Sequence, residues 1–386
     1  MCANLRAPVS PFESDGSGRV FFRCRGLPTC LWAQRRSRTP RRSTLVIQTR
    51  TRARIVTSGI LVGLTLLPNA FAAEVQHATN AALLTLEAKI PLGEVSGRID
   101  HLAFDPTRKR LYVAELGNNS IGIIDLQARR VTRTVPGFDE PQGVGYEPAT
   151  DTVYVANGGD GTVRLFSGSQ FETSGTISLG KDADNIRVGR AEHRVYVGYG
   201  DGAVAIIDPH TRKCVADITL KGHPEGFQLD PDGDSIFVNV PDAGHIAVLS
   251  REAGRQVAAW PTEGGRANYP LALDAEKGRV ISVFRAPAHL QAYEMRSGHA
   301  VAGSDVCKYS DDLFIDAKRR RIYVICGEGY VDTLDTSGDA YTRVGSFVTS
   351  DGSRTGLFVP DLDRLFVAVR ASRSETAAVW VLRPSP

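Results

Sequence analysis

The sequence predicts an all-β fold, a seven-bladed β-propeller of four-stranded blades, from a repeat and its period. A hydrophobic strand, a polar Asn/Gly turn and a second hydrophobic strand recur along the chain, most clearly in RLYVAELGNNSIGIIDL from Arg110 to Leu126. Equivalent residues of successive copies are 42, 42, 41, 44, 42 and 43 positions apart, a period typical of propeller blades. These residues are Tyr112, Tyr154, Tyr196, Phe237, Ile281, Tyr323 and Phe366.

Each full repeat has the material for four strands. The first reads HLAFDP, RLYVAE, SIGIIDL and RVTRTVPG, with a tight turn at Asp105–Lys109 between the first two. The two inner segments are apolar on both faces, as expected for a sheet packed between two neighbouring sheets.

The two ends of the repeat array predict how the ring closes. The segment Leu83–Gly93 resembles the outer strand of a blade but has no blade of its own, and the last repeat supplies only three strands. We therefore expect the N-terminal strand to complete the last blade, which would remove an open sheet edge.

The N-terminal region is predicted to be a leader. Ile55–Leu67 is an apolar stretch of 13 residues, too short to span a bilayer; three arginines precede it and the small-x-small site Ala70–Ala72 follows it. These features predict a signal peptide within residues 1–73 and a mature propeller over residues 74–386, without a transmembrane segment and located in the periplasm or secreted.

The first 45 residues fit a leader less well, because they are rich in Arg, Ser and Pro. One interpretation is a start site assigned too far upstream, with initiation near Leu45 or Val46. A twin-arginine export signal at Arg41–Arg42 is the alternative.

Charge argues against a nucleic-acid partner. The formal charge of +3 arises from the leader, whose 73 residues hold 12 Arg and two acidic residues, so that 34 basic and 41 acidic residues remain. A nucleic-acid surface needs clustered cations, and the mature sequence shows none.

We expect the mature protein to be a monomer.

The cysteines give no metal-ligand spacing. Cys214, Cys307 and Cys326 lie outside the leader, without a CxxC pair. A disulfide between Cys307 and Cys326 is one option; burial of Cys326 as a small apolar residue is the other.

The repeats resemble a known family. RLYVAELGNNSIGIID, VYVANGGDGTVRLF and VYVGYGDGAVAIID are similar to the YVTN-type propeller repeat of exported bacterial YncE-like proteins, whereas RVISVFRAPAHLQAY departs from it. The resemblance covers roughly residues 83–386 and implies architecture more than function. At greater distance it extends to bacterial lactonases and streptogramin lyases, without a catalytic motif that could be carried over.

The loops that enter the innermost strands predict the binding site, because they meet at the mouth of the central funnel. The candidate ligand-binding residues in these loops are Asp100, Gln142, Asp184, Asn185, Glu225, Tyr269, Asp311 and Thr355. Loops between the second and third strands add Asn118, Asn119, Asp160, Asp201, Asp242, Glu328, Arg285 and Arg370 on the same face.

A ring of carboxylates at this mouth has three interpretations. Asp100, Asp184, Glu225 and Asp311 could bind Ca²⁺ or Mg²⁺ through hard oxygen ligands. They could be solvated lining, or form a catalytic site in which His101 or His223 is the general base. The first functional hypothesis is a binding module for a protein or a small polar ligand; the alternative is a metal-assisted lactonase or lyase.

Overall fold

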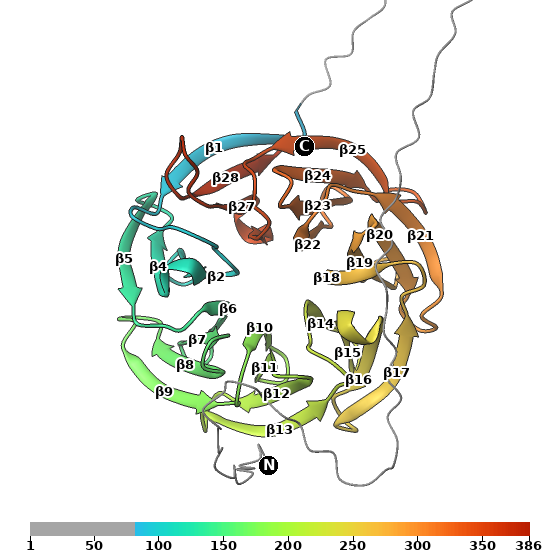
Figure 1. The fold of residues 1–386 in the computed structure, drawn as a ribbon, viewed down its shortest axis with the longest axis horizontal. Coiled ribbons are helices and arrows are strands. Elements are labelled where there is room, and N and C mark those ends of the chain that lie inside the picture. The colour runs from blue at the N-terminus through green and yellow to red at the C-terminus, as the bar shows by residue number, and fades with distance from the viewer. Residues whose placement is uncertain (1–81) are drawn as a thin grey trace, which may run out of the picture. The chain divides into compact units, whose positions relative to one another are not determined.

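The computed structural model describes residues 82–386. The predicted leader, its cleavage site and the two interpretations of the start site lie outside the described residues. Within residues 82–386 the chain forms seven four-stranded antiparallel sheets arranged as the blades of a propeller around a central axis (Figure 1). The predicted seven-bladed propeller is confirmed.

The strands of blades 1 to 7 follow the chain from the axis outwards. The innermost strands are β2 (Leu102–Asp105), β6 (Pro141–Glu147), β10 (Ala183–Gly189), β14 (Phe227–Leu229), β18 (Arg266–Asp274), β22 (Ser310–Asp316) and β26 (Gly356–Val359). The second strands are β3 (Arg110–Glu115), β7 (Thr152–Asn157), β11 (Arg194–Tyr199), β15 (Ser235–Val240), β19 (Arg279–Ala286), β23 (Arg321–Cys326) and β27 (Arg364–Val369).

The third strands are β4 (Ser120–Asp125), β8 (Thr162–Ser167), β12 (Ala203–Asp208), β16 (His245–Ser250), β20 (Ala288–Glu294), β24 (Tyr330–Asp335) and β28 (Ala378–Pro384). The outer strands are β5 (Arg130–Pro136), β9 (Thr173–Ser178), β13 (Lys213–Thr219), β17 (Arg255–Pro261), β21 (Ala300–Asp305), β25 (Thr342–Val348) and β1 (Leu84–Pro91). Short 3₁₀ turns η1 (Leu116–Asn118), η2 (Pro241–Ala243) and η3 (Pro360–Leu362) complete the described elements.

The hydrophobic core lies between blades. Side chains alternate across a strand, so Tyr112 of β3 packs on blade 2 with Val153 and Phe166, whereas Leu111 and Val113 face blade 7. Seven buried clusters of this kind occur among the described residues, and each draws its side chains from two adjacent blades. The apolar pattern on both faces of the inner strands therefore follows from packing on two sides.

The strand β1 lies in the same sheet as the last three strands of the chain. It pairs antiparallel with β28, with Leu84 opposite Pro384 and Pro91 opposite Ala378. Ile90 of β1 is fully buried in the cluster shared by blades 7 and 1. Chain segments almost 300 residues apart thus form one blade, drawn in blue and red at the top of Figure 1.

Every outer strand carries an irregularity at the same place. In each of the seven sheets, pairing between the third and outer strands skips one residue of the outer strand. The skipped residues are Glu87, Thr132, Ser174, Val215, Val257, Val301 and Val344. Bulges interrupt the row of free backbone groups on an edge strand and so hinder pairing with another chain.

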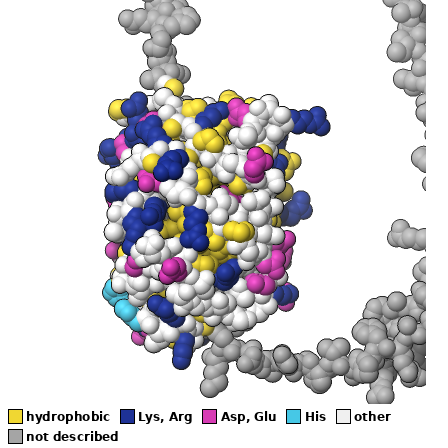
Figure 2. All heavy atoms as spheres, turned by 90° about the vertical axis from the view of Figure 1, so that its left-hand side faces the viewer, with side chains coloured by type: hydrophobic (Ala, Val, Ile, Leu, Met, Phe, Trp, Pro, Cys, Tyr) yellow, Lys and Arg dark blue, Asp and Glu magenta, His cyan; other side chains and the backbone are white. Residues whose placement is uncertain are grey.

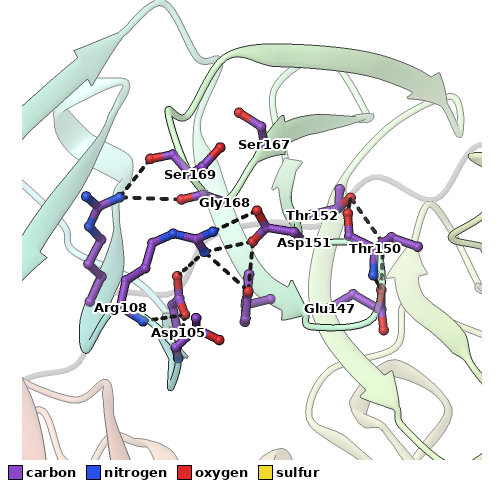
Figure 3. A network of polar contacts seen from close by, with 12 residues as sticks. Asp105, Arg108, Glu147, Thr150, Asp151, Thr152, Ser167, Gly168 and Ser169 are labelled. Carbon is purple, nitrogen blue, oxygen red and sulfur yellow. Dashed lines mark hydrogen bonds and ion pairs between the residues drawn. The ribbon is translucent and has the colours of Figure 1, made fainter.

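Ion pairs join neighbouring blades on the face opposite the funnel mouth. Arg108, in the turn after β2, binds Asp105 of its own blade at 2.8 Å and Asp151 of blade 2 through both terminal nitrogens, at 2.7 and 2.8 Å (Figure 3). The Tyr146 hydroxyl also donates to Asp151. Arg319 repeats the arrangement between blades 6 and 7.

The outer wall on the side of β5 carries basic and acidic side chains interspersed with small hydrophobic areas (Figure 2). No helix within residues 82–386 is long and apolar enough to cross a membrane.

The pairing of β1 with β28 predicts that blade 7 depends on the N-terminal strand. Ile90→Ala should lower the free energy of unfolding by about 2–5 kcal/mol, the usual loss for a fully buried Ile. Urea unfolding of the protein followed by tryptophan fluorescence measures it. Leu86→Ala is the matched control, because Leu86 is 38 % exposed and its loss should change stability by less than about 1 kcal/mol. Equal, small effects of both substitutions would contradict the assignment of β1 to blade 7.

Candidate functional site

A polar cavity of about 250 Å³ opens at the funnel mouth, and all seven blades contribute to it. The lining residues come from the innermost strands and their entry loops, except Arg285 at the end of β19. In blade order they are Arg98, Gln142, Asp182, Asp184, His223, Glu225, Tyr269, Arg285, Asp311 and Arg354.

The structure separates the predicted site residues into two groups. Gln142, Asp184, Glu225, Tyr269 and Asp311 line the cavity, as does the candidate His223. Asp100, Asn185, Thr355 and His101 are not part of its lining.

Three of the residues that do not line the cavity are buried: Asp100, Asn185 and Thr355. Asp100 is 1 % exposed and its Oδ2 lies 2.8 Å from Nη2 of Arg98. Thr355, equally buried, donates from its hydroxyl to the Ile99 carbonyl at 3.1 Å, which links blade 7 to blade 1. Asn185 is 3 % exposed in β10.

Three arginines line the cavity, of which sequence reasoning named Arg285 but missed Arg98 and Arg354. Arg285 and Arg354 both bind Asp311, at 2.5 Å and 2.7 Å, while Arg98 binds Asp100. The signal was present in the sequence: Arg98 lies two residues before Asp100, and Arg354 directly before Thr355, in the loops already singled out. The predicted carboxylates are therefore one half of a mixed-charge site.

Arg285 is held by three contacts before any ligand arrives. Its Nε donates to the Ser310 carbonyl at 2.9 Å, its Nη2 to Asp311, and its guanidinium lies 3.6 Å from the ring centre of Tyr269. Asn239, buried in β15, in turn donates to the Tyr269 carbonyl at 3.1 Å. A cation fixed in this way loses little side-chain entropy on binding an anion.

His101 belongs to a buried network outside the cavity lining. Its Nδ1 lies 3.5 Å from Asp312, whose other neighbour is the backbone N–H of Gly356 at 2.9 Å. Burial opposes the imidazolium, but the charge of Asp312 and then that of Asp100 raise the pKa of His101 to about 10. An imidazolium has no free lone pair, so this environment does not favour a general base at neutral pH.

His223 is charged at neutral pH for a similar reason. Its Nδ1–H donates to the Gly200 carbonyl at 2.7 Å, and its Nε2 lies 3.9 Å from Asp184. Burial opposes the charged form, but Asp184, the Gly200 carbonyl and Asp182 raise the pKa of His223 to about 9. The imidazolium is suited to donate a hydrogen bond or a proton.

Two carboxyl groups of the cavity differ sharply in their environment. Burial opposes ionisation of Asp184, but the positive charges of His223 and His101 lower its pKa. Glu225 has no hydrogen bond or ion pair from its carboxyl group to any residue in 82–386, and burial followed by the charges of Asp184 and Asp311 raises its pKa to about 8. Glu225 is thus a carboxyl group held largely protonated beside an ionised one.

Three of the four predicted metal ligands face cationic side chains of the protein. Asp100 and Asp311 are paired with arginines, and Asp184 faces His223. Within the described part of the chain, no three His, Cys, Asp or Glu side chains come together as a metal cluster. Binding of Ca²⁺ or Mg²⁺ stays a prediction.

A disulfide fixes the loop that presents Asp311. Cys307 and Cys326 are bonded, with their Cα atoms 5.8 Å apart and both side chains buried. The bond ties the segment before β22 to the end of β23, and so holds Lys308–Asp311 over the blade. The first of the two cysteine options is the one that the structure shows.

A larger hollow of about 1050 Å³ lies on the opposite face, between the turns of blades 3 and 4. Arg251 crosses it to bind Glu192 at 2.6 Å. Glu192 occupies the place that Arg108 has in blade 1, so this hollow is a variant of the contact between blades.

Removal of the disulfide should loosen the fold. Cys307→Ala/Cys326→Ala should lower the free energy of unfolding by about 3 kcal/mol, because the bond closes a loop with a sequence separation of 19 residues. Urea unfolding under non-reducing conditions measures the change. An unchanged midpoint would contradict a stabilising role for the bond.

The environment of Glu225 predicts that its substitution stabilises the protein, by an amount that depends on pH. The pKa of Glu225 is about 8 in the folded protein, whereas an ordinary glutamate has a pKa of about 4.3. Its stabilising contribution is therefore present below about pH 4.3 and is lost as pH rises towards 8. Glu225→Gln should therefore have the same free energy of unfolding as the wild type near pH 4.5, and one higher by roughly 1–3 kcal/mol at pH 8. This gain is smaller than the full pKa difference implies, because neighbouring groups relax around the charged glutamate.

Thermal unfolding of both proteins across this pH range checks the difference. Glu263→Gln is a surface control, because Glu263 is exposed. A constant difference between wild type and Glu225→Gln at all pH values would contradict the buried, repelled state of Glu225.

The comparisons with known proteins bear on the fold. No protein-family model and no curated protein sequence matches the chain. Among solved structures, the Kuenenia stuttgartiensis hydrazine synthase is similar with a TM-score of 0.64 and 16 % identity over 74 % of this chain and 97 % of that one. A chain in the crystal structure of the mitotic checkpoint complex is similar with a TM-score of 0.66 and 13 % identity. The match covers 86 % of this chain and 99 % of that one. At such identities the likeness establishes the propeller architecture and nothing of the chemistry.

Proposed function

We propose that this protein is a binding module whose funnel mouth takes a small polar ligand. The observation that carries the proposal is the cavity of about 250 Å³ with charged groups from most of the blades facing one space. Ligand sites are concave and place a few polar groups precisely, and sites for drug-sized ligands start near 300 Å³. A cavity slightly smaller than this suits a metabolite with few heavy atoms.

Preorganisation and unsatisfied groups support binding. Arg285 is fixed by its three contacts, while its Nη1 makes no hydrogen bond or ion pair with any residue in 82–386. Asp184 is 7 % exposed, lines the cavity, and has no hydrogen-bond partner for Oδ1. Buried polar atoms normally have a partner, so a donor on a ligand would satisfy this one.

A family and a location belong to the proposal as well. The Asn/Gly-turn repeats support membership of the YVTN-type propellers, and the apolar leader supports export to the periplasm or the medium. The disulfide between Cys307 and Cys326 supports an oxidising compartment.

The alternative is an enzyme of the lactonase or lyase class. Its support is the pair formed by a protonated His223 and the perturbed carboxyl group of Glu225, since perturbed groups cluster at catalytic sites. In that case His223 would act as the general acid. Loss of turnover of a lactone panel in His223→Gln, with ligand binding retained, would favour the enzyme over the module.

Thermal unfolding with a compound panel tests the binding proposal. The panel contains carboxylates, phosphate, amines, amino acids, neutral sugars, Ca²⁺ and Mg²⁺. A ligand at 100 times its Kd should stabilise the protein by about 2.7 kcal/mol, and Arg285→Gln should abolish the shift. Arg130→Gln, an exposed arginine on β5, is the control that should retain it. No shift with any compound, or a shift that survives in Arg285→Gln, would overturn a ligand site at the mouth.

A further inference from the structure

The charges of the cavity are sorted by blade. Its acidic arc is formed by Asp182 and Asp184 of blade 3 and Glu225 of blade 4. Its basic arc is formed by Arg285 of blade 5, Arg354 of blade 7 and Arg98 of blade 1. Because the blades are adjacent in chain order around the ring, the two arcs occupy different sides of one mouth (Figure 1).

Asp311 and His223, the other charged groups of the lining, leave the two arcs distinct. Asp311 of blade 6 lies within the basic arc, where Arg285 and Arg354 both bind it, so two arginines share one carboxylate. His223 lies within the acidic arc, 3.5 Å from Asp182 and 3.9 Å from Asp184. Each arc therefore keeps charge beyond its internal pair, because two arginines share one carboxylate in the basic arc and two aspartates share one imidazolium in the acidic arc.

Open hydrogen-bonding positions exist on both arcs. On the acidic side, the buried Asp184 leaves Oδ1 without a donor, and the carboxyl group of Glu225 has no partner in the described chain. On the basic side, Arg285 has engaged Nε and Nη2, and Arg354 only Nε. A guanidinium has five N–H donors in a planar fork that matches a carboxylate.

We propose that the ligand of the funnel mouth is a free α-amino acid, bound as its zwitterion. Its carboxylate lies against Arg285 and Arg354, and its ammonium lies against Asp184 and Glu225. The two charges of an α-amino acid are one carbon apart, which requires opposite charges on neighbouring parts of the lining. Asp184 and Glu225 of blades 3 and 4 line the same cavity as Arg285 of the adjacent blade 5.

The same contacts argue against ligands with a single charge. An anion alone would leave the Asp184 oxygen unsatisfied, and a cation alone would leave the free guanidinium donors of the basic arc unused. The lining is also nearly free of apolar side chains, the ring of Tyr269 excepted, so a polar side chain on the amino acid fits it better than an aliphatic one.

This inference rests on the proposed function, and the test separates the two. The twenty L-amino acids are screened by thermal shift against the full protein, and the strongest binder is compared by calorimetry with its analogues lacking the ammonium or the carboxylate. For serine these are 3-hydroxypropanoate and ethanolamine. The amino acid should bind at least tenfold more tightly than either analogue.

Two substitutions assign the ends of the ligand. Glu225→Gln should weaken the amino acid about tenfold and leave the analogue without an ammonium unaffected, whereas Arg285→Gln should weaken both. Glu225→Gln is expected to fold, because it is nearly isosteric and removes a repelled carboxyl group; Arg130→Gln again serves as the control.

Each outcome decides one of the claims. If a singly charged analogue or another compound of the wider panel binds as tightly as its amino acid, the zwitterion inference is overturned while the ligand site stands. If Glu225→Gln weakens both ligands equally, the placement of the ammonium is wrong. If no compound binds, both the inference and the proposed function fall.

Discussion

Packing of each blade between two neighbours is the constraint on which the rest of the structure depends. A four-stranded sheet with apolar side chains on both faces cannot bury them alone, and seven such sheets in a ring form seven buried clusters between adjacent blades. The junction between blades 7 and 1 obeys the same rule, which is why the fully buried Ile90 comes from the N-terminal strand. Ion pairs such as Arg108 with Asp151 reinforce junctions that apolar contact already defines.

This constraint also creates the functional site. The ring brings one entry loop per blade to a common axis, so residues about 42 positions apart in the chain become neighbours around one cavity. Charged side chains there are partly removed from water, which strengthens their mutual interactions. The raised pKa of Glu225 and the raised pKa of His223 are both products of that convergence.

Much of the fold could be predicted from the sequence, because each blade of a propeller corresponds to one repeat of the chain. Tyr112, Tyr154 and their equivalents occupy the same buried position in successive blades. The last repeat lacks one strand, and an extra strand-like segment precedes the first repeat. The bulges of the outer strands could not be predicted, since the skipped position is Val in blades 3 to 6 but Glu87, Thr132 or Ser174 in the others. Their position follows from backbone pairing.

The site was only half predictable for a related reason. Position within a repeat identified Asp184, Glu225 and Asp311, because these residues sit at equivalent places in their loops. It did not show that Arg98 and Arg354 line the same cavity, that Asp100 is buried against Arg98, or that Thr355 bonds across to blade 1. Direction of a side chain depends on neighbouring blades, which a single repeat does not contain.

The measurement that tests this account most directly is the ionisation of Glu225 itself. Side-chain carboxyl ¹³C chemical shifts of glutamate-labelled protein, assigned with Glu225→Gln, would follow its titration. The account predicts a midpoint near pH 8, set by burial and by the charges of Asp184 and Asp311. A midpoint at the ordinary glutamate value of about 4.3 would mean a solvated carboxylate, and would contradict a preorganised binding mouth.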